Sequence, residues 1–165
     1  MEIRIADRLI GDAHPSFIIA ELSANHNHDI ERAKQIVKVA AECGADAIKL
    51  QTYTPDTLTF DSNDPAFQVD GTIWEGKNLY QLYAEAHLPW DWHKPLFDCA
   101  RDVGITIFSS PFDSTAVDLL EDLNAPAYKI ASFEAIDLAL IKYVAATKKP
   151  MIISTGMANQ DEIHE

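Results

Sequence analysis

The sequence is poor in basic charge. Its 165 residues include 13 lysines and arginines against 26 aspartates and glutamates, which gives a net charge of -13. A protein this acidic is repelled by nucleic acid and by anionic membrane surfaces, so we expect neither as a partner. An anionic small molecule would need a locally positive pocket.

Cysteines and long apolar runs are also scarce. The two cysteines, Cys43 and Cys99, form no CxxC pair or Cys/His cluster, and we expect both to be buried free thiols in a reducing compartment. No apolar run approaches ~18 residues, so no segment is expected to span a membrane. The charged segment 1–12 does not resemble a signal peptide, and we expect a cytoplasmic protein.

Short apolar runs alternate with amphipathic stretches along the chain. The runs with the length of strands are 16–22, 46–52, 103–112, 126–132 and 149–156. The stretches with helical spacing are 29–44, 90–104, 113–125, 134–149 and the beginning of one at 159–165. Nearly continuous apolar strands are typical of a parallel sheet covered by helices. One long segment, 53–89, interrupts the alternation with turn-forming residues and a helical piece near 77–87, and loops of this length are usually functional.

This alternation predicts an α/β fold. A TIM (β/α)8 barrel has eight such units and about 250 residues, whereas four to five units are present here. An open doubly wound sheet fits the length but leaves a last helix of only about seven residues. We therefore expect residues 1–165 to be the N-terminal part of a truncated TIM barrel, without its C-terminal half-barrel, and with exposed apolar surface where further strands would dock.

Two predicted strands carry a lysine inside an apolar run. Lys49 lies in "AIKLQTY" and Lys129 in "AYKIASFE". Charge in a core strand is costly unless it is paired or used. Gln51 follows Lys49 by two residues and shares its side of the strand, because side chains alternate along a strand.

Polar side chains gather at the carboxyl ends of all five predicted strands. They include Glu21, Lys49, Gln51, Ser110, Lys129, Ser132, Glu134 and Ser154. In parallel α/β proteins this edge binds ligands. Two lysines with several hydroxyls and two glutamates predict a site for a phosphorylated, carboxylated substrate. We expect five of them to converge on one pocket: Glu21, Lys49, Ser110, Lys129 and Ser154.

These side chains also have structural explanations. The two lysines can form ion pairs with Glu21 and Glu134, and the serines can cap the helices that follow them. A Schiff-base aldolase would also place a lysine on a barrel strand, although a pair of lysines fits charge recognition better.

The histidines are weaker candidates for functional residues. His26 and His28 in "NHNHD" are candidate metal ligands, but two histidines at this spacing in a loop are more often solvated or hydrogen-bonded. His14, His87 and His93 belong to no recognisable constellation, so ordinary structural roles are expected for them.

Five stretches together resemble the sialic acid synthase family. They are "FIIAELSANHNHD", "GADAIKLQTYTPDTLT", "FSSPFD", "YKIASFE" and "ISTGMA". The resemblance begins near residue 16 and continues to residue 165, and "ELSANH" and "QTYTPDTLT" look most like the pseudaminic acid synthase branch. His28 stands where glycine is common in that family.

The resemblance implies a transferase that condenses phosphoenolpyruvate with an amino-sugar aldehyde of the 2,4-diacetamido-2,4,6-trideoxy-altrose type. The product would be a nonulosonic acid, pseudaminic acid, for cell-surface glycans such as those on flagellin, and phosphate would be released. It also implies a homodimer, a divalent metal (Mn or Mg) held by two histidines of the second half-barrel, and an antifreeze-like domain. We expect the second half-barrel and the antifreeze-like domain to be absent here. We therefore expect residues 1–165 to hold no metal and to be inactive on their own.

The matched motifs assign expected roles to single residues. Those expected around phosphoenolpyruvate are Lys49, Ser110, Lys129, Ser132 and Ser154. Gln51 and Glu134 would face the sugar, Glu21 would lie near the reacting carbons, and Phe112 would contact substrate. The catalytic residues would be Glu21, Lys49, Lys129 and Glu134. Because an uncompensated lysine is unfavourable, we expect the free protein to pair Lys49 with Glu21 or with an anion.

Three alternatives stay open at this point. An N-acetylneuraminate synthase would use the same chemistry on another sugar. A Schiff-base aldolase would form a covalent lysine adduct. A non-catalytic half-barrel would associate with a separate C-terminal chain.

Overall fold

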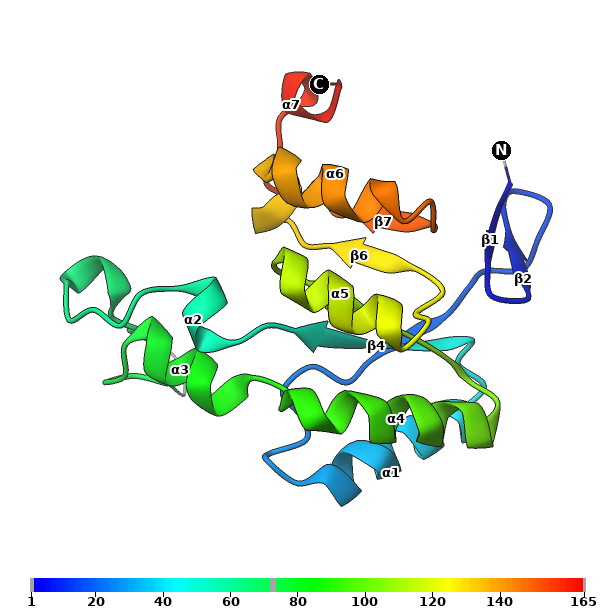
Figure 1. Cartoon of the computed structure of the whole chain (residues 1–165), viewed down its shortest axis with the longest axis horizontal. Helices are drawn as coiled ribbons and strands as arrows, with labels where there is room; N and C mark the ends of the chain where they lie inside the picture. Colours follow the sequence, from blue (N-terminus) through cyan, green and yellow to red (C-terminus); the bar gives the residue numbers. More distant parts are fainter. Residues whose placement is uncertain (1, 72–73, 165) are drawn as a thin grey trace.

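The computed structural model describes residues 2–71 and 74–164, and its centre is a parallel sheet (Figure 1). The sheet has five strands in the order β3-β4-β5-β6-β7. They are β3 (Ile19–Glu21), β4 (Ala47–Thr52), β5 (Thr106–Pro111), β6 (Tyr128–Ile130) and β7 (Met151–Ile153). Every neighbouring pair is parallel.

The strand order distinguishes between the two predicted architectures. The strands stand side by side in chain order, without the reversal that a doubly wound sheet has at its switch point. The connecting helices are α1 (Ile30–Glu42), α4 (Trp90–Val103), α5 (Ser114–Asp122) and α6 (Leu138–Ala146), and a short α7 (Gln160–His164) follows β7. The arrangement is that of a half-barrel. Among the described residues, no helix is long and apolar enough to cross a membrane.

The two faces of the sheet pack against different partners. Alternate residues such as Ile48, Leu50 and Ile107 pack against α1 and α4, and Tyr128 and Ile130 pack against α5 and α6. The opposite, inner face carries a separate apolar cluster, here called the floor. It includes Ile19, Ala47, Phe108 and Ile152 on the strands and Ala127 directly before β6. Helices on one face and an apolar layer on the other are what a barrel wall requires.

A β-hairpin that was not predicted closes the amino-terminal end of the floor. Strands β1 (Ile3–Ile5) and β2 (Arg8–Ile10) are antiparallel, and Ile5 is completely buried in the floor cluster. Arg8 forms an ion pair with Asp46, directly before β4, and thereby fixes the hairpin to the sheet. Figure 1 places this hairpin at the opposite end of β4 from α2 and α3.

The long segment 53–89 projects from the carboxyl end of β4 (Figure 1). It contains α2 (Pro55–Leu58), the 3-10 turn η1 (Pro65–Phe67) and α3 (Leu79–Ala86), which confirms the helical piece predicted near 77–87. The Tyr80 hydroxyl donates a hydrogen bond of 2.9 Å to Asp56 and so ties α3 to α2. The helices α2 and α3 therefore lie together at the carboxyl end of β4, where the polar strand ends lie.

Several predicted strands and helices are shorter in the structure, and two of the differences have a clear local cause. The strand predicted at 103–112 begins only at Thr106, because α4 continues to Val103 and ends at Gly104 in the left-handed conformation, with φ 75°. The helix predicted at 134–149 is split into the 3-10 turn η2 (Phe133–Ile136) and α6. Asp137 separates them, because its side chain accepts a 3.0 Å hydrogen bond from the Leu140 amide and caps α6.

The cysteine prediction holds for one residue only. Cys99 is a buried free thiol on α4, as expected. Cys43 is a free thiol too, but it is exposed. It forms the C-cap of α1 rather than a position on the buried stripe of that helix, so its burial was wrongly predicted.

Apolar side chains are exposed around the β7 edge of the sheet, as the barrel interpretation predicted. Ile153 on β7 is 41% exposed, and Met157 after it is 62% exposed. Phe133 and Ile136 on the neighbouring turn η2 are 73% and 72% exposed. β7 has one neighbouring strand, β6, so its other edge carries no strand pairing in the sheet.

The packing of β4 against α1 and α4 predicts a large effect of Leu50→Ala. Leu50 is fully buried, so its truncation should lower the free energy of unfolding by about 2–5 kcal/mol in urea denaturation. Val39→Ala is the matched control, because Val39 lies on α1 but is 42% exposed, and its effect should stay within about 0.5 kcal/mol. Equal effects of the two substitutions would contradict this account of the core.

Candidate active site

Polar residues follow the floor on the inner face of the sheet. Two residues beyond each of the five floor residues stand Glu21, Lys49, Ser110, Lys129 and Ser154. Side chains two residues apart share one face of a strand, so all five belong to the same face of the sheet. These are the five residues that we expected to converge, and the geometry brings them to one side of the sheet.

Lys49 is paired with Glu21, as predicted for the free protein. Glu21 and Lys49 are register partners on β3 and β4, and Lys49 Nζ lies 2.7 Å from Glu21 Oε2. The lysine side chain is only 9% exposed, whereas the glutamate side chain is 53% exposed. The ion pair therefore neutralises a buried cation with an anion that reaches in from solvent, and another anion can take its place.

Lys129 lies within electrostatic range of the same pair. Burial lowers the pKa of Lys129, the neighbouring positive charge of Lys49 lowers it further, and Glu21 and Glu134 oppose the shift. Two ammonium groups from β4 and β6 thus face one region of the inner surface. A bound anion would offset both the burial and the mutual repulsion.

Two buried polar atoms in this region have no hydrogen-bond partner. They are the Ser110 hydroxyl and Glu134 Oε2. Leaving a buried polar atom unpaired costs about 1–3 kcal/mol, so such atoms are retained where a ligand satisfies them. Gln51 lies beside Ser110, since the two are register partners on β4 and β5.

Glu134 has the environment of a proton carrier. Burial raises the pKa of its carboxyl group, and the positive charge of Lys129 only partly opposes that shift. A carboxyl group with a raised pKa can hold a proton and deliver it to a neighbouring oxygen. Glu134 occupies this position because η2 is a separate turn that follows β6 directly.

Two strand-end loops meet at Ser132. A side chain at Gly156 would place its first carbon 3.7 Å from the Ser132 hydroxyl oxygen, so the loop after β7 passes close to η2. The Ser154 amide donates a 3.0 Å hydrogen bond to the Ile130 carbonyl, which continues the sheet pairing to the site. Ser132 and Ser154 are both half-buried at this edge.

An aromatic cluster stands one layer above Gln51 and Ser110. Tyr53 and Phe112 follow them by two residues, and their rings meet edge to face at 5.4 Å between centroids. Tyr83 from α3 packs against the other side of Tyr53 at 5.7 Å. Tyr53 is buried, and its burial followed by the proximity of Tyr83 raises its pKa to about 12. Only Phe112 was predicted as a site residue; Tyr83 was missed because it comes from α3, outside the strands.

His93, a buried histidine on α4 for which only an ordinary structural role was expected, is hydrogen-bonded to the carboxyl end of β4. His93 Nδ1 lies 3.3 Å from the Pro89 carbonyl and must donate to it, so Nε2 accepts from the Thr52 hydroxyl at 2.8 Å. The Thr52 oxygen then accepts from the Ser109 hydroxyl at 2.6 Å. This chain of hydrogen bonds joins α4, β4 and β5 and fixes the residues next to Gln51 and Ser110.

The two histidines after β3, His26 and His28, pack against each other with ring centroids 5.8 Å apart. His26 is buried, its Nδ1 accepts a 3.2 Å hydrogen bond from the His28 amide, and its ring meets Trp92 edge to face. His28 bonds the Glu85 carbonyl and so reaches α3. Residues 2–71 and 74–164 contain no group of three or more metal-ligating side chains.

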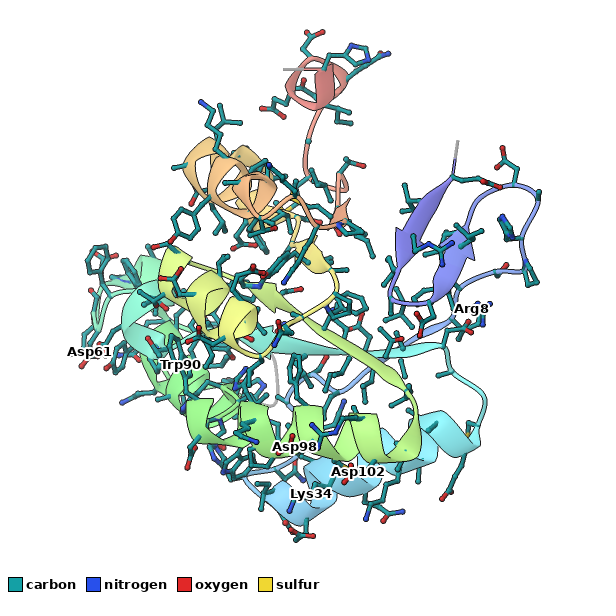
Figure 2. The ribbon with its side chains drawn as sticks, turned by 45° about the vertical axis from the view of Figure 1, so that its right-hand side comes forward. Arg8, Lys34, Asp61, Trp90, Asp98 and Asp102 are labelled. Carbon is teal, nitrogen blue, oxygen red and sulfur yellow. The ribbon has the colours of Figure 1, made fainter. Side chains whose placement is uncertain are left out.

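The site lies at the end of the molecule that carries Trp90 and Asp61 in Figure 2. Trp90 Nε1 donates a 3.3 Å hydrogen bond to the Tyr53 carbonyl and marks the carboxyl end of β4. Arg8 marks the opposite end. A separate cleft near that amino-terminal end is lined by residues such as Phe97, Arg101 and Thr106. The predicted site residues do not line it, and in barrels this end serves stability rather than catalysis.

Comparison with known proteins agrees with this arrangement. A model of the NeuB family matches residues 36–165. The chain belongs to the NeuB family. The family resemblance inferred from the sequence motifs is thereby confirmed, and so is the barrel-type fold.

Curated relatives and a solved structure extend the match to the amino-terminal strands. Pseudaminic acid synthases from Helicobacter pylori and Campylobacter jejuni are 51% and 48% identical over 92% and 89% of this chain. The N-acetylneuraminic acid synthetase of Leptospira borgpetersenii, solved with citrate, has a TM-score of 0.85 at 28% identity over 99% of this chain. The chain spans 44%, 43% and 53% of those three proteins.

His93 predicts how stability depends on pH. Burial lowers the pKa of His93 from 6.5 to about 4, so below pH 6.5 the unfolded chain takes up a proton that the folded chain does not. Between pH 7 and pH 5 the wild type should therefore lose about 2 kcal/mol more of its unfolding free energy than His93→Gln does. Urea denaturation at both pH values measures this. Parallel pH profiles of the two proteins would show that His93 is not the responsible group.

Proposed function

We propose that this chain contributes the phosphoenolpyruvate-binding part of a nonulosonic acid synthase of the pseudaminic acid type. The observation that carries the proposal is the placement of Lys49 and Lys129 together on the inner face of a half-barrel. The pseudaminic acid synthase relatives and membership of the NeuB family support the same conclusion. The whole reaction is proposed for a protein that also has the remainder of the barrel.

The two lysines suit an anion with two charged groups. Phosphoenolpyruvate carries a carboxylate and a phosphate, and it would replace Glu21 as the partner of Lys49 while it also contacts Lys129. The unpaired Ser110 hydroxyl would donate to one of its oxygens, with Ser132 and Ser154 at the same edge. Charge-assisted hydrogen bonds of this kind are about twice as strong as neutral ones.

The proposed reaction needs groups that donate and accept protons, in addition to the lysines that bind the anionic substrate. Carbon 3 of phosphoenolpyruvate forms a bond to the aldehyde carbon of the amino sugar, and the aldehyde oxygen takes up a proton. Glu134, with its raised pKa, would give that proton, and Gln51 would orient the sugar. Water would add at carbon 2 and pass one proton to the half-exposed Glu21. The bond between carbon 2 and the phosphate oxygen would then break, the hydroxyl proton would leave with the phosphate, and a carbonyl group would form at carbon 2.

The proposal also covers the metal, the compartment, the oligomeric state and the use of the product. The described side chains supply no ligand set for Mn or Mg, so no step here is assigned to a metal. We propose a cytoplasmic reaction, where phosphoenolpyruvate is available, a homodimer as the assembled enzyme, and a product used for cell-surface glycans such as those of flagellin. An N-acetylneuraminate synthase is the alternative within the family, and it differs in the sugar alone.

One observation favours a second candidate function, a Schiff-base aldolase. The lowered pKa of Lys129 is the property that an amine needs to attack a carbonyl. Borohydride reduction in the presence of pyruvate would then attach a three-carbon adduct to Lys129, which mass spectrometry detects. The proposed synthase forms no such adduct.

The lysine pair predicts that phosphoenolpyruvate binding takes up a proton. Because the pKa of Lys129 is lowered in the free protein, a bound anion should raise it, and calorimetric titrations in two buffers at alkaline pH should reveal proton uptake. Lys129→Met should abolish the uptake, and Lys49→Met and Lys129→Met should each weaken binding at least about tenfold. Lys38→Met, on the exposed side of α1, is the matched control. Unchanged affinity in both site variants would refute the proposed function.

A further inference from the structure

Beyond Lys49, the inner face of the sheet becomes aromatic. Gln51 and Ser110 are register partners on β4 and β5, and Tyr53 and Phe112 stand two residues further along the same two strands. Tyr83 completes this group from α3. The three rings, here called the aromatic rim, therefore border the open end of the site rather than its charged interior.

The rim is built so that one ring positions the other two. Tyr53 is 5% exposed and is held between Phe112 and Tyr83, with interplanar angles of 75° and 80°. Trp90 additionally holds the Tyr53 backbone carbonyl. Phe112 and Tyr83 are only half-buried, so ring surface on both stays available to a ligand.

The rim also adjoins the proposed acid. The negative charge of Glu134 contributes, after burial, to raising the pKa of Tyr83, so the ring from α3 and the carboxyl group after β6 face one region. The apolar substituents of a molecule bound in this region would meet aromatic carbon, while its hydroxyl groups would meet Glu134 and Gln51.

We propose that the aromatic rim is the specificity-determining subsite for the second substrate and selects a sugar with an apolar substituent at its far end. This proposal rests on the proposed function, in which that substrate is an amino-sugar aldehyde. Phe112 and Tyr83 contact the methyl group of a 6-deoxy sugar or an acetamido methyl, and Tyr53 is a positioning residue. An apolar pocket of this kind favours a methyl group over a hydroxymethyl group by about tenfold or more.

The test compares two sugars that differ by one oxygen. The probes are 2,4-diacetamido-2,4,6-trideoxy-altrose and its 6-hydroxy counterpart, both reduced to alditols so that no carbonyl remains to react. Each is titrated calorimetrically into this chain in the presence of phosphoenolpyruvate. The 6-deoxy compound should bind about tenfold more tightly, and Phe112→Ala and Tyr83→Ala should each remove most of that preference.

Three further variants separate the effect of the aromatic rings on the sugar preference from other effects of substitution. Tyr83→Phe retains the ring and should retain the preference, whereas Tyr53→Ala should reduce it by releasing the other two rings. Phe60→Ala is the matched control, because Phe60 belongs to the same long segment and is 78% exposed. Circular dichroism should show equal folding of all variants.

Binding of phosphoenolpyruvate alone separates the two proposals. If the wild type does not bind it, the proposed function fails. If it binds but neither alditol does, or if the alditol preference survives both alanine substitutions, the aromatic rim is not the sugar subsite while the proposed function stands.

Discussion

The arrangement of the site depends on one buried cation. Lys49 is almost fully enclosed on a strand whose other inward neighbours are Ala47 and Gln51, and its charge is balanced by Glu21 at 2.7 Å. The Glu21 side chain is 53% exposed, so it neutralises Lys49 and can still be displaced by another anion. Lys129 adds a second positive charge whose pKa is lowered by burial and by Lys49. In a protein of net charge -13, these two lysines lie on one face of the sheet, where an anion can contact both.

The inner face is ordered in layers that follow from strand alternation. The β1–β2 hairpin closes the apolar floor, the charged and polar side chains of the strand ends follow it, and the aromatic rim comes last. Each step is two residues further along a strand. Under the proposed function, charge is recognised next to the floor and apolar groups are recognised at the rim.

Much of this arrangement was predictable from the sequence, because strand alternation fixes the side of each residue. The apolar runs around Lys49 and Lys129 predicted parallel strands, and their shared face followed from position alone. The hairpin was missed because its two strands have three residues each and its interior contact, Ile5, is made with distant strands. Tyr83 was missed for the same reason: its neighbours Tyr53 and Glu134 are remote in sequence, and only the folded segment 53–89 brings them together.

The central claim is that an anion binds between Lys49 and Lys129, and a crystal structure of this chain with phosphoenolpyruvate tests it most directly. The account predicts phosphate or carboxylate oxygens within about 3 Å of both Nζ atoms, with Glu21 displaced from Lys49 and the Ser110 hydroxyl donating to the ligand. Phosphoenolpyruvate bound elsewhere, for instance in the cleft beside Arg101, with the Lys49–Glu21 pair intact, would contradict it.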